Sequence, residues 1–237
     1  MPARSGSPER PIATLNEGPL HAALKAWYAR NGDRLEVPVE GRQIDIVRGD
    51  LLIEIQTSNL AALRRKLETL IEDHPVRLVH PVALEKWILR IDGDTQRVLG
   101  RRRSPRRGKL EDAFKELVSL AKLLAHPDFS CEILLTREEE VRINEPGRAW
   151  RRHGWVIVER RLIDVVDTHL FCDRSDLRRI LPPDLPARFT TADLADALRI
   201  ASNLAQKMAY CLREAGAIAV EGKRGNARTY RVTGWGA

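Results

Sequence analysis

The stretch Gln43–Gln56, which reads QIDIVRGDLLIEIQ, decides the fold that we expect for this chain. It predicts a β-hairpin, because two runs rich in β-branched residues flank the pair Gly49-Asp50. A glycine at the first loop position suits a two-residue turn of type II′. Side chains alternate between the two faces of a strand, so one face of this hairpin is expected to point into the core. The residues on that face are Ile44, Ile46, Ile53 and Ile55.

The turn also fixes which residues stand across from each other on the second face. Asp45 is expected opposite Glu54, with Cβ atoms roughly 5 Å apart, a separation at which two like charges repel. A hard divalent cation takes oxygen ligands and relieves that repulsion, so a pair of carboxylates beside Gln56 indicates a metal site. The alternative is a solvated strand face that carries two unrelated acids. Both interpretations stay open at this point.

The segments around the hairpin favour the first interpretation. A predicted helix over 18–29 carries Glu17 at its start, and a strand candidate over 35–39 follows. A long amphipathic helix begins after Thr57-Ser58-Asn59, and residues 76–82 have the pattern of a buried strand. The order is helix with Glu, strand, strand with Asp, strand with Glu-x-Gln, helix and strand. This order resembles that of the PD-(D/E)xK nuclease superfamily, which includes archaeal Holliday-junction resolvases and restriction endonucleases.

The resemblance implies an α/β fold, with a restriction-endonuclease-like mixed sheet flanked by helices over residues 14–146. It also implies a nuclease that depends on Mg²⁺ or Mn²⁺. Matched to the motif, the metal ligands are Asp45, Glu54, the Ile55 carbonyl and Glu17. Gln56 takes the position of the motif lysine and completes the expected catalytic set of Glu17, Asp45, Glu54 and Gln56. As an acid at the start of a helix, Glu17 is also explained by the helix dipole alone.

Glutamine in place of lysine removes a positive charge from the expected site. The helix that starts after Asn59 carries Arg64, Arg65 and Lys66 on its first two turns. Arg64 or Lys66 is expected to reach back toward the carboxylates and supply the missing cation, which would stabilise charge developing on a scissile phosphate. A solvated helix face is the alternative explanation for at least one of the three residues.

Composition and charge favour a polyanionic partner. The 237 residues carry 40 Lys and Arg against 33 Asp and Glu, a formal net charge of +7. A basic protein of this kind most often binds nucleic acid, and DNA is the partner that we expect. No run of about eighteen apolar residues marks a membrane span, and the N-terminus lacks a hydrophobic signal region, so we expect a cytoplasmic protein with no membrane partner. Three widely spaced cysteines favour neither a zinc site nor a disulfide framework.

An arginine-rich run over 97–109 contains seven basic residues and no acid. Its Gly, Ser and Pro residues predict a loop. A mobile loop of this composition suits phosphate contacts, which are independent of sequence and sensitive to salt. A charge run that is merely solvated is the alternative. The expected DNA contacts in this run are Arg101, Arg102, Arg103, Arg106 and Arg107.

The last third of the chain has a different pattern from the first two. We expect a disordered tail over 1–13, a linker over 147–159 and a second domain over 160–237. The apolar residues over 162–171 predict a helix at the start of that domain, and 174–181 predict another.

A short helix over 189–198 is expected, with Thr190 or Thr191 as its N-cap. Together with a helix over 202–213 and two strands joined by the basic loop 221–228, it resembles a winged helix-turn-helix domain. In that family the second helix enters the major groove of DNA and the wing touches the backbone. The alternative is a protein–protein module, a role that many winged helices have. The residues expected on the DNA are Ser202, Asn203, Gln206 and Lys207 of the second helix, with Lys223, Arg224 and Arg228 of the wing.

Two functions follow from these patterns. The first is a metal-dependent endonuclease that hydrolyses DNA phosphodiester bonds and is held on DNA by the winged helix. The second is a nuclease-fold protein that has lost activity with its lysine and acts as a DNA-binding regulator or assembly factor. The three acids favour the enzyme, and Gln56 favours the binding protein. Nucleases of this type often act as dimers, and the sequence leaves a homodimer open.

Overall fold

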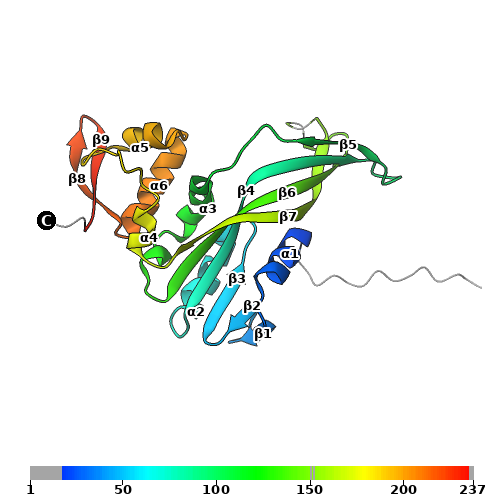
Figure 1. The fold of residues 1–237 in the computed structure, drawn as a ribbon, viewed down its shortest axis with the longest axis horizontal. Coiled ribbons are helices and arrows are strands. Elements are labelled where there is room, and N and C mark those ends of the chain that lie inside the picture. The colour runs from blue at the N-terminus through cyan, green and yellow to red at the C-terminus, as the bar shows by residue number, and fades with distance from the viewer. Residues whose placement is uncertain (1–17, 150, 152, 235–237) are drawn as a thin grey trace, which may run out of the picture.

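The structure is a computed structural model that describes residues 18–149, 151 and 153–234. The expected tail over 1–13 and the predicted ligand Glu17 lie outside these residues. The chain folds as an α/β protein, in which helices flank both faces of one large mixed sheet, as the sequence predicted (Figure 1). None of the helices within the described residues is long and apolar enough to cross a membrane.

The predicted hairpin is present as β2 (Arg42–Arg48) and β3 (Leu51–Ile55). Its register is the expected one, with Ile46 opposite Ile53 across the strands. Gly49 in the turn has a φ of 58°, a left-handed conformation that glycine adopts without a steric penalty. The tight turn and the register of the residues next to it were therefore predicted correctly from the sequence.

The hairpin lies toward one end of a sheet that contains seven strands among the described residues. The order in space is β1-β2-β3-β4-β6-β7, and β5 pairs with the second half of β4. Strands β3, β4 and β6 are parallel to one another, and the other neighbours are antiparallel. The remaining strands are β1 (Arg34–Val39), β4 (Val76–Ile91), β5 (Val98–Arg103), β6 (Phe129–Asn144) and β7 (Trp155–Phe171).

Helix α1 (Pro19–Tyr28) covers one face of the sheet near the hairpin. It begins with a proline at its first helical position, where the missing N–H has no partner to lose. Leu20, Leu24 and Tyr28 recur at helical spacing and are buried against the strands, whereas Trp27 is exposed. The cluster consists of Leu20, Leu24, Tyr28, Ile46, Ile53, Ile55, Val79 and Leu134.

Helix α2 (Leu60–Leu70) and a series of short helical turns pack into the cluster on the opposite face. The turns are η1 (Leu110–Ala113), α3 (Phe114–Leu117), η2 (Val118–Leu120) and η3 (Leu123–Ala125). Ile44 belongs to this second cluster, so the prediction that it shares a face with Ile46 was wrong. The ladder between β2 and β3 ends at Ile46, and the pairing of β2 with β1 skips Asp45, where Glu36 of β1 has a φ of 51°.

Strand β7 corrects the sequence analysis, which predicted a linker over 147–159 and a helix over 162–171. Residues 155–171 form an edge strand of the large sheet, antiparallel to β6. Register shifts leave Val158, Ile163 and Val166 without a partner opposite them on β6. Each of these β-bulges adds a residue and breaks the alternation of period two, so the apolar pattern imitates a helix. The sheet therefore continues to Phe171, well past the boundary expected at 146.

Strand β5 corrects a second prediction, since the arginine-rich run 97–109 is not a loop throughout. Its first part, β5, pairs with β4 from Trp87 to Ile91. Ladder hydrogen bonds override the Gly and Arg content of the strand, which predicts no regular structure by itself.

The C-terminal residues form three helices and a two-stranded sheet within the described part of the chain. These are α4 (Arg174–Arg178), α5 (Thr191–Leu198), α6 (Ser202–Glu214), β8 (Ile218–Arg224) and β9 (Ala227–Val232). Thr190 caps α5 in a capping box with Asp193, as the threonine pair at 190–191 led us to expect for one of its members.

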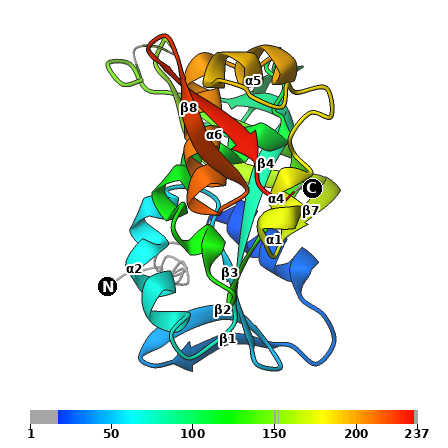
Figure 2. The same cartoon turned by 90° about the vertical axis from the view of Figure 1, so that its left-hand side faces the viewer.

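The C-terminal elements gather at one side of the molecule, remote from β1 and β2 (Figure 1, Figure 2). Their apolar side chains join the same buried cluster as α2 and α3, and α6 packs against α3. The C-terminal part therefore shares a hydrophobic core with the helices on the sheet. This continuity gives the two parts of the chain a fixed relation that a flexible linker would not provide.

The segment after β5 is pressed against β4 at Gly108, which gives a sharp test of the fold. A Cβ atom on Gly108 would lie 2.2 Å from the carbonyl oxygen of Ala83, a backbone atom that cannot move aside cheaply. We expect Gly108→Ala to lower the free energy of unfolding by about 1–3 kcal/mol, measured by urea denaturation. Gly100→Ala is the matched control, since its Cβ meets nothing within 4 Å, and it should stay within about 0.5 kcal/mol of wild type. Equal effects of the two substitutions would contradict the packing of this segment.

Candidate functional site

A cleft of about 760 Å³ opens where β2 and β3 part, beside the loop that leads into α2. Asp45, Glu54, Gln56 and Lys66 line it together with His21 from α1. Counted from the turn, Ile46 is the last residue of β2 that pairs with β3, and Asp45 is the next residue along the strand. Asp45 Oδ2 accepts a hydrogen bond from the N–H of Ile55 at 2.7 Å. A side chain thus takes the hydrogen bond that a main-chain carbonyl would take in a regular hairpin. The two predicted acids converge on one cleft, although the ladder does not pair them directly as expected.

Asp45 is held from both sides of the cleft. The Nε2 atom of His21 lies 3.2 Å from Asp45 Oδ2, and the Ile55 N–H donates to the same oxygen. Burial acts to raise the pKa of Asp45, but the hydrogen bonds from His21 and Ile55 outweigh it and hold this pKa below its usual value. Asp45 is therefore an anion at neutral pH. The sequence analysis missed His21, which carries no signal beyond its position near the start of α1.

Glu54 is the most deeply buried group of the cleft, with 4% of its surface exposed. Lys66 Nζ donates to Glu54 Oε1 at 2.6 Å and to the Gln43 carbonyl at 2.5 Å. Burial raises the pKa of Glu54 to about 7, against the lowering effect of the Lys66 charge, and the nearby charge of Asp45 raises it further. The site therefore holds a carboxyl group that titrates near neutral pH.

The expectation that Arg64 or Lys66 reaches the carboxylates is met by Lys66. Arg64 instead points along α2, where it forms an exposed pair with Glu68 at 3.6 Å. Lys66 is only 20% exposed, so its ammonium group is largely withdrawn from bulk water. Helix α2 thus brings an ammonium group into contact with Glu54.

Gln56 has its polar groups engaged by the loop and by the next strand. Its side-chain Nε2 donates to the Ser58 carbonyl at 2.6 Å, and its N–H donates to Val79 at 3.0 Å. The carbonyl of Gln56 accepts from His80 Nδ1 at 2.6 Å, so His80 carries its proton on Nδ1. Burial lowers the pKa of His80, which favours the neutral ring. The sequence analysis did not place His80 in the site. In the structure, His80 holds the main chain of Gln56 through this hydrogen bond.

A buried ion pair holds the loop between β3 and α2. Glu138 is fully buried, and Arg160 Nη2 of β7 donates to it at 2.8 Å. The Nη1 atom of the same arginine donates to the Thr57 carbonyl at 3.4 Å. Sequence reasoning missed both residues, because it placed residue 160 at the start of a separate C-terminal domain and not on a strand of the large sheet. The pair fixes the rim of the cleft from a strand about a hundred residues away.

Oxygen atoms remain available for a cation in the cleft. Within the described residues, Asp45 Oδ1 and Glu54 Oε2 accept no hydrogen bond, and the Ile55 carbonyl belongs to the same lining. These oxygens suit a hard divalent cation. No group of three or more His, Cys, Asp or Glu side chains arranged for a metal occurs within residues 18–149, 151 and 153–234. Glu17, the third predicted acid, lies just outside the described range.

The predicted DNA contacts of the arginine-rich run are exposed, and several are paired. Arg101 donates to Glu139 at 2.7 Å, and both Arg103 and Arg107 pair with Glu85. Arg102 and Arg106 are exposed and form no ion pair among the described residues.

The predicted contacts of the C-terminal part fall into two groups. Lys207 donates to the Lys115 carbonyl at 3.1 Å, and Arg224 pairs with Asp193 at 2.7 Å, so these two cations support the local fold. The other predicted contacts lie at the surface without an ion pair among the described residues. They are Ser202, Asn203, Gln206, Lys223 and Arg228.

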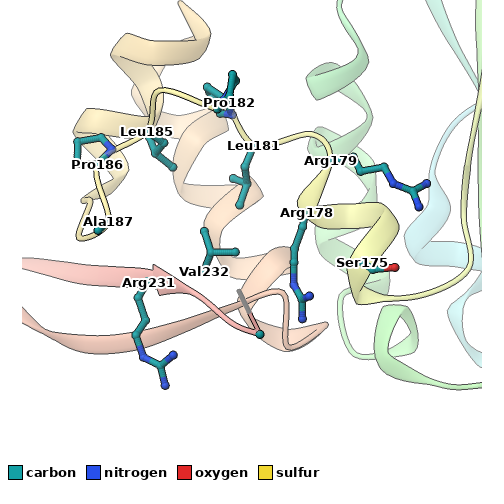
Figure 3. Close-up of a pocket in the computed structure, with 12 residues that line it drawn as sticks. Ser175, Arg178, Arg179, Leu181, Pro182, Leu185, Pro186, Ala187, Arg231 and Val232 are labelled. Atoms are coloured by element: carbon teal, nitrogen blue, oxygen red, sulfur yellow. The ribbon is translucent and has the colours of Figure 1, made fainter. Parts of the chain in front are cut away.

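A second hollow of about 700 Å³ lies between α4, the proline-rich segment and β9 (Figure 3). Leu181, Pro182 and Leu185 give it an apolar wall, and its polar lining comes from Ser175, Arg178, Arg179 and Arg231 (Figure 3). No carboxylate is among the residues that line it.

The comparisons with known proteins define the family. A family described as "Domain of unknown function (DUF8091)" matches residues 18–172. The chain belongs to this family. The match begins just before α1 and ends just after β7, so it covers the whole sheet and the cleft. The chain is also 31% identical over 224 residues to an "Uncharacterized protein" of Treponema pallidum (strain Nichols), which covers 93% of this chain and 87% of the relative. No solved structure matches the chain.

The raised pKa of Glu54 predicts a specific dependence of stability on pH. In the folded state Glu54 keeps its proton up to about pH 7, whereas the unfolded chain releases it near pH 4.5. Since the folded state binds the extra proton, wild type loses stability as the pH rises between these values. Glu54→Gln cannot ionise, so its stability relative to wild type should rise by on the order of 2 kcal/mol between about pH 5 and pH 8.

Thermal unfolding in EDTA across this pH range measures the difference. Glu68→Gln on the exposed side of α2 is the control, and its difference from wild type should stay flat. A flat difference for Glu54→Gln as well would show that Glu54 is not perturbed by burial.

Proposed function

We propose that this protein is a metal-dependent DNA endonuclease related in its chemistry to the PD-(D/E)xK nucleases. The observation that carries the proposal is the convergence of Asp45, Glu54 and Lys66 on one cleft at the end of a split hairpin. One buried acid, a second that is 15% exposed and a cation that is 20% exposed are costly to bring together at one site, and such arrangements are typical of catalytic centres. The mixed sheet with helices on both faces agrees with the fold of that superfamily.

Each residue has a role in the proposed site. Asp45 and Glu54 would hold Mg²⁺ or Mn²⁺ with the Ile55 carbonyl, and Glu17 would bind it directly or through a water. A bound divalent cation lowers the pKa of a coordinated water and neutralises charge on the phosphate. His21 and the Ile55 N–H keep Asp45 ionised and aimed into the cleft.

Lys66 takes over the role of the motif lysine in this proposal. Its ammonium orients the Glu54 carboxylate through a hydrogen bond of 2.6 Å. Because Lys66 is only 20% exposed, its positive charge also stabilises negative charge that develops on the phosphate. Gln56 is tied to Ser58 and supplies no charge, so we assign it to support of the loop.

The C-terminal part would hold the DNA as a winged helix. Helix α6 presents Ser202, Asn203 and Gln206 at its exposed surface, and Asn and Gln can hydrogen-bond adenine edges. The β8–β9 hairpin carries Lys223 and Arg228 on its outer surface, where they suit phosphate contacts. The net charge of +7 supports a polyanionic partner.

A second candidate function is a DNA-binding protein without catalysis. The observation in its favour is the ion pair between Lys66 and Glu54, which neutralises one of the two acids when no cation is bound. In that case the nuclease fold would serve only as a scaffold for the C-terminal part.

Cleavage of supercoiled plasmid in Mg²⁺ or Mn²⁺ decides between the two functions. We expect nicked and linear products from wild type, and a loss of at least about 100-fold for Asp45→Asn, because the metal ligand is removed. Lys66→Met should lose about 100-fold as well, with partial rescue by Lys66→Arg. Glu68→Gln should cut like wild type. Intact plasmid with wild type, together with retained DNA binding, would support the second candidate.

The wing makes a separate prediction about affinity. Lys223→Glu combined with Arg228→Glu should weaken binding to duplex DNA and flatten the dependence of log K on log salt by roughly two units. Fluorescence anisotropy at several salt concentrations measures both quantities. Arg30→Glu combined with Arg34→Glu, near β1 and remote from the wing, is the charge-matched control. If the two double variants bind alike, the wing does not contact DNA.

A further inference from the structure

Strand β5 is unusual because it is exposed along its whole length. It pairs only with β4 among the described strands, at the end of the long sheet that is remote from β8 and β9 (Figure 1). We call the segment from Trp87 to Arg107 the β4–β5 arm. An exposed strand with a free edge invites a partner, since its main-chain groups and both faces are open.

Two aliphatic side chains near the tip of the arm have no protein neighbours to bury them. Val98 is 57% exposed and Leu99 is 56% exposed, the highest values among the large hydrophobic residues of the described chain. Val98 lies opposite Ile91, whereas Gly100 lies opposite Arg90, so a β-bulge leaves Leu99 without a partner on β4. A bulge re-aims a side chain, and here it turns an aliphatic residue outward beside another.

Basic side chains outnumber acids around these two residues. Arg97, Arg101 and Arg102 flank them, and the arm carries seven arginines against two acids, Asp92 and Asp94 of its turn. Arg101 and Arg103 lie over the face of Trp87, each 5.5 Å from the ring centre, which holds them in a fixed direction. Arg97, Arg102 and Arg106 form no ion pair among the described residues, so their charge is available to a ligand.

The exposed aliphatic residues of β7 show that this pattern is not general. Val158 and Ile163 are also left out of register by bulges and are 48% and 46% exposed. They share their strand with Glu159, Asp164 and Asp167, so their surroundings are of mixed charge. Within the described residues, the arm places the two most exposed large hydrophobic side chains beside three arginines that form no ion pair, Arg97, Arg102 and Arg106.

We infer that the β4–β5 arm inserts Val98 and Leu99 into the base stack of duplex DNA from the minor groove while its arginines hold the flanking phosphates. The inference rests on the proposed DNA-binding function and names its substrate as duplex DNA that can be bent. Apolar wedges unstack a base step at a cost of a few kcal/mol and kink the duplex. Burial of the two side chains and the phosphate contacts offset that cost. Pyrimidine–purine steps open most easily, so they are the expected points of insertion.

The full-length protein in EDTA tests the inference without cleavage. The probes are short duplexes that carry 2-aminopurine next to a TA or CA step, since this base becomes brighter when it is unstacked. We expect wild type to raise the fluorescence by roughly threefold or more and to bend the duplex in an energy-transfer assay. Val98→Ser combined with Leu99→Ser should abolish both signals while changing the affinity at low salt by less than about fivefold.

Val158→Ser combined with Ile163→Ser is the matched control and should behave like wild type. Arg102→Ala combined with Arg106→Ala should reduce affinity and flatten the salt dependence by roughly two units. All substituted side chains are exposed, and unchanged thermal unfolding confirms that each variant is folded.

Three outcomes would overturn the inference. If wild type binds duplex DNA and the 2-aminopurine fluorescence does not increase at any base step, the arm does not insert, although the proposed function stands. If wild type binds no DNA, the inference and the proposed function both fall. If the aliphatic variant unstacks DNA like wild type but loses association with another protein, the arm is a protein-binding surface.

Discussion

The hydrogen bond from the Ile55 N–H to the side chain of Asp45 is the interaction on which the rest of the site depends. A hairpin of β-branched residues would continue its ladder, and its second face would be a row of cross-strand pairs. Here a carboxylate accepts the main-chain N–H at the point where the strands part. Because a side-chain oxygen replaces a main-chain carbonyl as acceptor, the Ile55 N–H stays hydrogen-bonded while the two strands separate. A cleft then opens at the end of a rigid pair of strands. Catalytic and binding groups gain accuracy from such a support, because strands move less than loops.

The cleft contains unfavourable electrostatic interactions that the fold itself does not require. Glu54 is nearly buried next to another acid, and the hydrogen bond from Lys66 only partly offsets the loss of hydration. A ligand that brings positive charge to these oxygens reduces the repulsion between the two carboxylates and offsets their loss of hydration. The same reasoning explains why Asp45 and Glu54 differ in pKa: Asp45 receives two hydrogen bonds to its charged form, while burial dominates at Glu54. A site with one ionised acid and one that titrates near pH 7 can bind a cation and release a proton together.

The geometry of the whole molecule follows from long strands and one shared core. Strands β4, β6 and β7 extend well past the hairpin and carry β5 at their far end (Figure 1). The C-terminal elements are packed into the cluster that also buries α2 and α3. The cleft, the exposed surface of α6 and the β4–β5 arm are thus parts of one body. A long polyanion is a ligand that can reach several such surfaces at once.

The sequence by itself determined the local features: the turn at Gly49, the register of Ile46 and Ile53, and the cap of α5 at Thr190. Each depends on a few adjacent residues whose backbone preferences and periodicity agree. Tertiary structure decided the rest. The pairing that makes β7 a strand of the sheet, interrupted by three bulges, and the bond from Arg160 to Thr57 join residues far apart along the chain. Whether Lys66 or Arg64 contacts Glu54 likewise depends on how α2 is rotated against the sheet. Their positions in the sequence are compatible with a contact by either residue.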